Sequence, residues 1–511
     1  MRAPIPSPVI VCCAALLVAA CGSSGGSAGS VPDTVATDPA ASPAATAIAT
    51  APAAGDAAAT PALGDWPLFG LRPSRENATD RSTGITTTSV RRLRRVQVRL
   101  PGTVDSSPIV LLGVRVAGAT RDVAFLTTTY GRTLAVDLAR HRILWTFTPS
   151  AYDAVKGIPQ ITNASPAADP DRRYVYTASS DGLVHKLSVA DGREAPGAWP
   201  VRVTRDPTHE KLTSSFNVSG TRLIVATGGY IGDAPPYQGH VVSIERATGR
   251  VAAVFNSLCS DRREIIQPSS CPSSDSAIWA RSGAVVLPGG DLLVATGNAP
   301  FDGRVDWGDS VLRLDGDTLA VKQNWTPANQ EQLEASDGDL GSTAPAVLGG
   351  GLVLQGGKDA KLDLLDTTRL NGSGGASARL GGQLQTLATP GGDGVFSAPA
   401  VWHHSGRTLV FVTTGSGTTA YRLTGRRLAA VWANQRAGTS PVLAGGVLYV
   451  HDPTGGGLLA YAPATGRVLA TLPAGAGHWG SPVVTGGRIV LPEGNANDYA
   501  TTGVLDVYER R

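Results

Sequence analysis

The sequence predicts an all-β protein, and more narrowly an eight-bladed β-propeller built from four-stranded blades. Three observations support this fold class. A landmark of a small residue followed by proline recurs along most of the 511 residues. After each landmark come runs that alternate apolar and polar side chains, separated by turns that contain glycine. No amphipathic segment extends beyond two helical turns.

The landmark divides the chain into repeats. Two weaker copies without proline, near Ser215-Phe216 and Ser282-Gly283, fill the longest gap between the six full copies. This gives eight units of about 40–65 residues, each long enough for about four strands. A seven-bladed ring or two stacked β domains are the alternatives. The full copies are Ser107-Pro108, Ser165-Pro166, Ala344-Pro345, Ala398-Pro399, Ser440-Pro441 and Ser481-Pro482.

One strand stands outside this pattern and is predicted to close the ring. Residues 93–100 read as a strand but follow no landmark, so we expect them to complete the last blade, which runs from Pro482 to the C-terminus. The arginines at 91, 92, 94 and 95 are interpreted as solvated positions flanking an edge strand rather than as a binding patch.

The N-terminal 62 residues are predicted to export and tether the propeller, which is expected to occupy residues 63–511. Residues 9–20 form an apolar run that follows Arg2 and is too short to span a bilayer. The run ends in LVAAC at residues 17–21, which resembles the bacterial lipobox and implies cleavage after residue 20 and lipidation of Cys21. An ordinary signal peptide with a nearby cleavage site is the alternative. Residues 22–62, rich in Ala, Ser, Gly, Pro and Thr, are predicted to be a disordered linker.

Charge and cysteine content restrict the possible partners. The net charge of +3 gives no reason to expect a nucleic-acid partner, and we expect a monomer held to a membrane by its lipid, in the periplasm or at the cell surface. After export Cys259 and Cys271 remain, and they are predicted to form a disulfide worth about 3 kcal/mol. Two thiols without a nearby histidine do not suggest a metal site.

Several of the predicted outer runs resemble a known family. Runs of the form Ala-x-Asp-x-x-Thr-Gly-x-x-x-Trp are similar to the tryptophan-docking repeats of quinoproteins that bind pyrroloquinoline quinone, and residues 134–145 and 241–255 are imperfect copies. The resemblance covers most of residues 65–511 and implies the fold. Non-catalytic relatives, such as the scaffold lipoprotein of the outer-membrane β-barrel assembly machinery, carry similar repeats.

The resemblance also assigns roles to four residues, in the order found in the alcohol-oxidising quinoproteins. Trp279 matches the tryptophan that stacks under the cofactor, and Asn298 matches an asparagine that binds calcium. Asp339 falls where the catalytic aspartate is kept, and Lys358 where a cation contacts the quinone oxygens. Each residue also has a structural interpretation: a blade-packing tryptophan, two turn residues and a solvated lysine.

The chain departs from the family in ways that bear on activity. The mature chain has no adjacent cysteines, and residues 228–233 contain no glutamate where a calcium ligand is expected, so Asp233 or Asp309 would have to substitute. No Cys-x-x-Cys-His motif for covalent haem is present, so a dehydrogenase would need an external electron acceptor. Two hypotheses remain: a dehydrogenase acting on an alcohol, a sugar or a hydroxylated polymer, and a non-catalytic scaffold that binds a protein or glycan.

The lipidation of Cys21 can be tested directly. We expect Cys21→Ser to release the protein from membranes into the soluble envelope fraction or the medium, because the acyl chains are the predicted anchor. Fractionation followed by immunoblotting measures this release. A correctly cleaved Cys21→Ser protein that stays on membranes would contradict the prediction.

Overall fold

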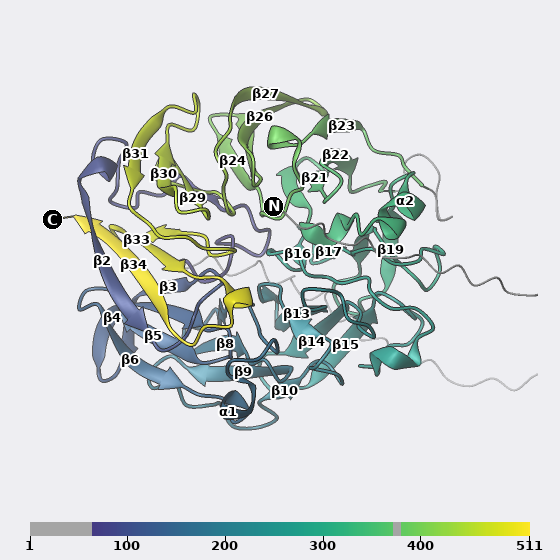
Figure 1. Ribbon diagram of the computed structural model, residues 1–511, viewed down its shortest axis with the longest axis horizontal. Helices are drawn as coiled ribbons and strands as arrows, with labels where there is room; N and C mark the ends of the chain where they lie inside the picture. The colour runs from purple at the N-terminus through teal and green to yellow at the C-terminus, as the bar shows by residue number, and fades with distance from the viewer. Residues whose placement is uncertain (1–63, 371–379, 511) are drawn as a thin grey trace, which may run out of the picture. The chain divides into compact units, whose positions relative to one another are not determined.

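The computed structural model describes residues 64–370 and 380–510, so the predictions for residues 1–62 lie outside the described residues. Eight β-sheets follow one another around a ring in chain order, which confirms the eight-bladed propeller (Figure 1). Seven sheets contain four or five strands that are consecutive in the chain. The eighth combines the last three strands with one strand from near the N-terminus.

The innermost strand of each blade begins directly after a landmark. All six landmark prolines immediately precede an innermost strand, and the two copies without proline lie just before the others. Blades 1 to 4 comprise β3(Ile109–Val116), β4(Ala119–Thr127), β5(Thr133–Asp137) and β6(Arg142–Phe147); β7(Ala167–Ala168), β8(Tyr174–Ala178), β9(Leu183–Ser188) and β10(Val201–Arg202); β11(Lys211–Leu212), β12(Asn217–Ser219), β13(Arg222–Gly228), β14(His240–Glu245) and β15(Val251–Asn256); and β16(Val285–Val286), β17(Leu292–Ala295), β18(Val311–Leu314) and β19(Val321–Trp325).

Blades 5 to 8 repeat the same antiparallel order. They comprise β20(Ala346–Gly349), β21(Leu352–Gly356), β22(Lys361–Asp366) and β23(Gln385–Ala388); β24(Ala400–His404), β25(Arg407–Thr413), β26(Thr418–Thr424) and β27(Arg427–Asn434); β28(Val442–Ala444), β29(Val447–Asp452), β30(Gly457–Tyr461) and β31(Val468–Leu472); and β32(Val483–Thr485), β33(Arg488–Glu493), β34(Gly503–Arg510) and β2(Leu93–Leu100). In addition, β1(Ala78–Thr79) pairs with β28.

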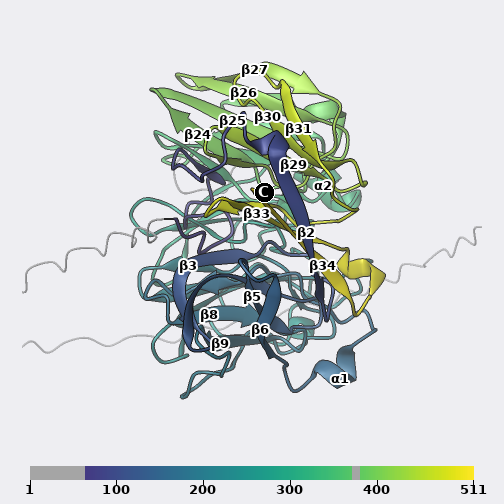
Figure 2. The same cartoon turned by 90° about the vertical axis from the view of Figure 1, so that its left-hand side faces the viewer.

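Strand β2 closes the ring as predicted. All eight of its residues pair in antiparallel register with β34, from Leu93 opposite Arg510 to Leu100 opposite Gly503 (Figures 1 and 2). The arginines at 91, 92 and 94 are exposed, as interpreted, whereas the half-buried Arg95 departs from that interpretation. Arg94 and Arg95 lie within β2, and Arg95 pairs with Asp506 at 2.8 Å because the paired strand presents that carboxylate across the ladder.

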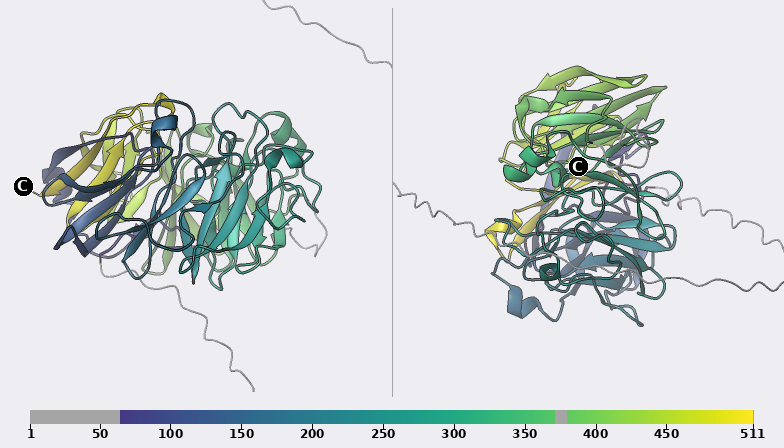
Figure 3. Two further views of the ribbon diagram at one scale, coloured as in Figure 1. Left: turned by 90° about the horizontal axis from the view of Figure 1, so that it is seen from below. Right: turned by 90° about the vertical axis from the view of Figure 1, so that its right-hand side faces the viewer.

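Neighbouring blades lie side by side and share apolar cores (Figure 3). Tryptophans on outer strands connect some of them, as the repeat resemblance implies. The indole Nε1 of Trp145 donates to the Val189 carbonyl of blade 2 at 3.1 Å, and that of Trp432 donates to the Pro463 carbonyl of blade 7 at 2.8 Å. Because a four-stranded sheet cannot bury both of its faces alone, these contacts make the blades interdependent.

Residues 64–85, which we call the N-terminal plug, run across the ends of the innermost strands. Their backbone bonds to Val110, Ala168, Val286, Val401 and Leu443, which lie in the innermost strands of five blades. The buried Arg75 guanidinium donates to the carbonyls of Ser215 and Phe216, and burial lowers the pKa of Arg75 to about 9. The repeat pattern did not predict this segment.

Helices are short among the described residues. The α-helices are α1(Tyr152–Val155) and α2(Gln330–Ala335), and the 3-10 helices are η1(Val90–Arg92), η2(Pro268–Ser270), η3(Leu340–Ser342), η4(Pro390–Gly392) and η5(Ala496–Asp498). None in this part of the chain has the length and apolar character needed to cross a membrane.

The closure by β2 predicts a specific loss of stability. Leu100 is buried in the core shared by blades 7, 8 and 1, whereas the adjacent Arg99 is exposed. We expect Leu100→Ala to lower the free energy of unfolding by about 2–5 kcal/mol, and Arg99→Ala to change it by less than about 0.5 kcal/mol. Urea denaturation followed by tryptophan fluorescence measures both. Equal effects of the two substitutions would contradict the role of β2 in closure.

Candidate functional site

A cavity of about 770 Å³ opens at the ends of the innermost strands that lie away from the N-terminal plug. Its walls come from the segments that precede the innermost strands and from the loops that join the second and third strands of the blades, so most blades contribute to one shared space. Residues from blades 3, 4 and 5 form one part of the wall, and residues from the last blades form another.

Three aromatic side chains meet in this cavity. The ring centroids of Trp279 and Phe396 are 5.9 Å apart, those of Phe396 and Trp479 are 5.9 Å apart, and those of Trp279 and Trp479 are 6.4 Å apart. Such tilted and edge-on arrangements are favourable for aromatic pairs. Together the rings form an apolar wall suited to a flat ligand.

An ion pair lies next to this wall. Lys358 Nζ is 2.7 Å from Asp339 Oδ2, 2.6 Å from Asp337 Oδ1 and 5.8 Å from the ring centroid of Trp279. Partial burial acts against the charge of Lys358, but Asp339 and Asp337 outweigh it and raise the pKa of Lys358. Burial raises the pKa of Asp339, although Lys358 and the Asn298 amide act in the opposite direction.

The backbone around Gly297 shapes the position of Asp339. The Asn298 amide donates to Asp339 Oδ1 at 2.8 Å, and a Cβ on Gly297 would lie 2.2 Å from the same oxygen. Glycine at position 297 is therefore required for the carboxylate to approach. This contact links two of the predicted site residues through the backbone.

Two further cations line the cavity without a carboxylate partner. Within residues 64–370 and 380–510, neither Lys211 nor Arg281 forms an ion pair, and both side chains are buried. Burial lowers the pKa of Lys211 to about 8 and that of Arg281 to about 10. Arg281 donates to the carbonyls of Asn163 and Thr213, each at 3.1 Å. The cavity wall therefore carries buried positive charge that no carboxylate pairs at contact distance, although the buried Asp105 acts against the lowering of both pKa values.

The structure brings three of the four predicted site residues to this cavity. Trp279, Asp339 and Lys358 line it, and Trp279 is not a docking tryptophan between blades. Asn298 does not line the cavity, and its described contact with the site is made by its backbone amide. Across the described ranges, no three His, Cys, Asp or Glu side chains gather to hold a metal ion. The role of Asn298 as a calcium ligand stays a prediction.

The two carboxylates considered as substitute calcium ligands lie apart. Asp233 is exposed, and its Oδ1 accepts a hydrogen bond from the Tyr237 hydroxyl at 2.9 Å. Asp309 is buried, with Oδ1 accepting from the Leu340 amide at 3.1 Å and Oδ2 lacking a hydrogen-bond partner in the described structure. Burial raises the pKa of Asp309 to about 7, and the charge of Asp339 adds to the shift.

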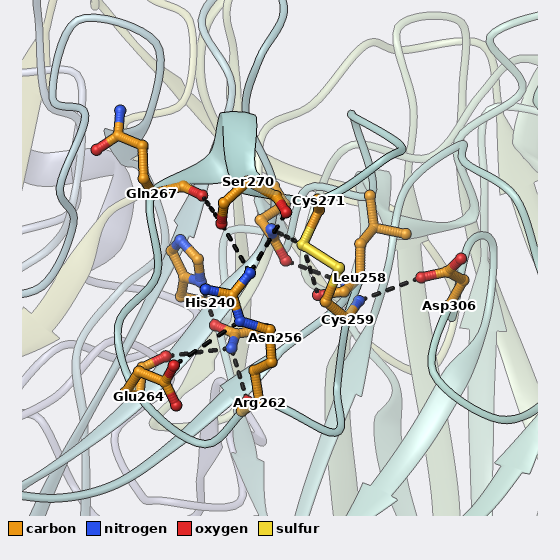
Figure 4. Close-up of a disulfide and its surroundings, with 11 residues drawn as sticks. His240, Asn256, Leu258, Cys259, Arg262, Glu264, Gln267, Ser270, Cys271 and Asp306 are labelled. Atoms are coloured by element: carbon orange, nitrogen blue, oxygen red, sulfur yellow. Dashed lines mark hydrogen bonds and ion pairs between the residues drawn. A yellow bond between two sulfur atoms is a disulfide. The ribbon is translucent and has the colours of Figure 1, made fainter.

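The predicted disulfide between Cys259 and Cys271 is present and braces the segment that leads to Trp279 (Figure 4). Asn256 Nδ2 donates to the carbonyls of Arg262 and Glu264 within the loop that the disulfide closes, and the Cys259 amide donates to Asp306. These contacts join the loop to blades 3 and 4.

Sequence reasoning missed several residues of the cavity. Lys211, Arg281, Phe396, His478 and Trp479 carry no motif, although each lies within a few residues of an innermost strand. That position was the available signal, because the segments before the innermost strands converge on the cavity.

A comparison with family models decides the family. The model described as outer membrane protein assembly factor BamB matches residues 78–263 and 282–472. The chain belongs to this family. No curated protein matches the chain in sequence. The two matched segments cover parts of every blade, so the BamB-family match concerns the propeller as a whole.

Solved structures similar to this BamB-family chain include alcohol-oxidising quinoproteins. The quinohemoprotein alcohol dehydrogenase from Comamonas testosteroni has a TM-score of 0.63 and 16% identity, covering 87% of this chain and 80% of that chain. The quinohemoprotein alcohol dehydrogenase ADHIIG from Pseudomonas putida HK5 has a TM-score of 0.67 and 14% identity, covering 88% of this chain and 80% of that chain. A europium-containing methanol dehydrogenase has a TM-score of 0.64 and 14% identity, covering 87% of this chain and 98% of that chain. At these identities the likeness shows the fold alone.

The buried Asp309 predicts a pH-dependent stability. Because its folded pKa of about 7 lies above its ordinary value, the folded state holds a proton that the unfolded state has lost, and stability falls as the pH rises from about 4 to 7. We expect the free energy of unfolding of Asp309→Asn to be about 2–4 kcal/mol higher than that of the wild type at pH 8, and the difference to be much smaller at pH 5. Urea denaturation at both pH values measures the difference, with the exposed Asp317→Asn as control. An effect of equal size at both pH values would contradict this prediction.

Proposed function

We propose that the propeller binds a flat, multiply anionic quinone of the pyrroloquinoline quinone class and oxidises an alcohol, a sugar or a hydroxylated polymer. The observation that carries this proposal is the pair of buried cations, Lys211 and Arg281, beside the aromatic wall of Trp279. A buried charge without a partner is costly, and a bound anion offsets that cost.

The cavity residues fit such a quinone. Pyrroloquinoline quinone is flat and carries three carboxylates, which need an aromatic surface and several cations. Trp279 supplies the surface, and Lys211 and Arg281 are free of carboxylate partners, whereas Lys358 is already paired with Asp337 and Asp339. Lys211 and Arg281 would therefore hold the carboxylates, and Lys358 would stay near the quinone oxygens.

The residues present do not assemble a calcium site. Asp339 is occupied by Lys358 and the Asn298 amide, Asp309 lies outside the cavity lining, and Asp233 is exposed at the rim. The proposed reaction therefore assigns no step to a divalent metal.

The bound quinone supplies the hydride acceptor. Asp339 would accept the proton of the substrate hydroxyl, because burial raises the pKa of its carboxyl toward the range in which a base works well near neutral pH. Lys358 would hold Asp339 in place and keep its carboxylate charged. The electrons would then pass to an external acceptor.

A tethered scaffold is the second candidate, and the BamB-family match favours it. In that role the propeller would bind a protein or glycan, and the cavity would serve no redox step. In both roles the proposed lipid on Cys21 would hold the propeller at the cell envelope, in the periplasm or at the cell surface.

Asp339 separates the two functions. We expect Asp339→Asn to bind pyrroloquinoline quinone as the wild type does, while dye-linked oxidation of alcohols, sugars or polyvinyl alcohol falls by roughly 10² to 10⁴. Lys358→Ala should weaken binding and turnover together. The matched control is Asp337→Asn, which removes the exposed partner of the same lysine and should lower turnover far less. Quenching of tryptophan fluorescence measures binding.

One outcome would decide against the dehydrogenase, and another would decide only against Asp339 as its base. If the quinone does not quench the tryptophan fluorescence of the wild-type protein and the protein does not reduce the dye, the scaffold remains as the function. Full turnover by Asp339→Asn would remove Asp339 as the base but keep the cofactor site.

A further inference from the structure

A histidine–aspartate pair forms part of the cavity wall where blades 8 and 1 meet. His478 Nδ1 lies 2.8 Å from Asp105 Oδ2, with 29% of the histidine side chain exposed and none of the aspartate side chain exposed. His478 precedes β32, Asp105 precedes β3, and His478 lines the cavity. Closure of the ring brings them together from positions 373 residues apart.

The surroundings of Asp105 fix which histidine nitrogen carries the proton. Asp105 Oδ1 accepts from the Trp479 amide at 2.7 Å, and Oδ2 accepts from the Ala496 amide at 3.0 Å. A carboxylate held by two backbone donors acts as an acceptor toward the ring as well. In the neutral imidazole Nδ1 therefore carries the hydrogen, and Nε2 presents a lone pair.

The other histidines buried in the propeller show a different pattern. Both ring nitrogens of His185 are bonded, to Ser179 and Glu194, and both of His240 are bonded, to Asn256 and Glu210. His451 likewise contacts two backbone carbonyls. By contrast, His478 Nε2 has no hydrogen-bond partner among the described residues. Because His478 lines the cavity and 29% of its side chain is exposed, this nitrogen is available to a ligand there.

We propose that His478, oriented by Asp105, is a second proton-accepting group of the cavity. Its Nε2 takes the proton of a hydroxyl group on a bound ligand: the O–H bond breaks, an Nε2–H bond forms, and Asp105 stabilises the resulting imidazolium. Asp105 acts as a positioning residue. Asp339 takes the proton of the substrate hydroxyl, so the proton that His478 accepts comes from a second hydroxyl group in the cavity.

Other charged groups lie near this pair. The Arg281 guanidinium lies 6.0 Å from the ring centroid of Trp479, whose centroid is 4.3 Å from that of His478. Lys211 lines the same cavity, and His451 lies next to Gly477. Glu493 accepts from the Gly475 amide, three residues before His478.

The role of the His478–Asp105 pair in turnover rests on the proposed dehydrogenase function. Oxidation of an alcohol to a carbonyl releases two protons with the two electrons that pass to the external acceptor. Asp339 and His478 give the cavity two groups to receive them. The tautomer and accessibility of His478 do not depend on that function.

The first test uses the full-length protein, with the spectra recorded without ligand and the chemical modification carried out with and without the quinone. We expect ¹⁵N-histidine spectra, assigned with His478→Gln, to show Nδ1–H and a free Nε2 for His478, and Asp105→Asn to change that tautomer. Diethylpyrocarbonate should modify His478, and saturating pyrroloquinoline quinone should protect it. The control is the surface pair His404–Asp80, with a distance of 3.1 Å and both side chains 51% exposed, which the quinone should not protect. An Nε2–H tautomer, or modification of His404 but not of His478, would overturn the proposal.

The second test measures dye-linked turnover of the quinone-loaded protein. We expect His478→Gln to lower turnover on the order of 10²-fold and quinone affinity less than about 3-fold, and His404→Gln to leave both unchanged. If the wild type binds the quinone and turns over, and His478→Gln shows full turnover, the role of His478 is overturned. The proposed function then still stands. Failure of the wild type to bind the quinone would contradict the proposed function, and the role of His478 in turnover with it. The tautomer measurement would then still decide whether the oriented pair exists.

Discussion

The structure depends on the need to bury both faces of every blade. A row of eight four-stranded sheets would leave two apolar faces open, and each sheet is too small to be stable alone. Pairing of β2 with β34 closes the row, and one core cluster then joins residues of blades 7, 8 and 1. The same closure creates the cavity, because it brings Asp105 of blade 1 next to His478 of blade 8. Fold and candidate site therefore share one constraint.

The repeat landmarks were sufficient to predict the blades but not the cavity. A proline favours an extended backbone before it and fixes its own φ, so Pro399 and its counterparts mark the entry to an innermost strand. Lys211 and Arg281 carry no such local signal, because they meet only after the blades have assembled. The N-terminal plug was missed for a related reason: its carbonyls and amides bond to strands of many blades, and no periodic pattern in residues 64–85 reveals this. Trp279, Asp339 and Lys358 were found through a family resemblance rather than through spacing.

The cavity contains two kinds of positively charged side chain, one paired with carboxylates and the other without a carboxylate partner. Lys358 is held by two carboxylates, as expected of a structural or positioning cation. Lys211 and Arg281 are instead buried near aromatic rings and bonded at most to neutral carbonyls. Unpaired buried charge lowers stability, and its presence at a binding cavity is consistent with a site organised for an anionic ligand rather than for the stability of the empty protein.

The central claim is that this positive charge serves an anionic ligand. Lys211→Met tests it most directly, because methionine is unbranched, is only one atom shorter than lysine and removes the charge. Calorimetric titration of pyrroloquinoline quinone into both proteins, together with their urea midpoints without ligand, gives the two quantities needed. We predict binding that is about 10- to 100-fold weaker in the variant, the loss expected for one charge-assisted contact, and a urea midpoint that is equal or higher. Unchanged affinity with a lower midpoint would show that Lys211 is a structural residue and would contradict the account.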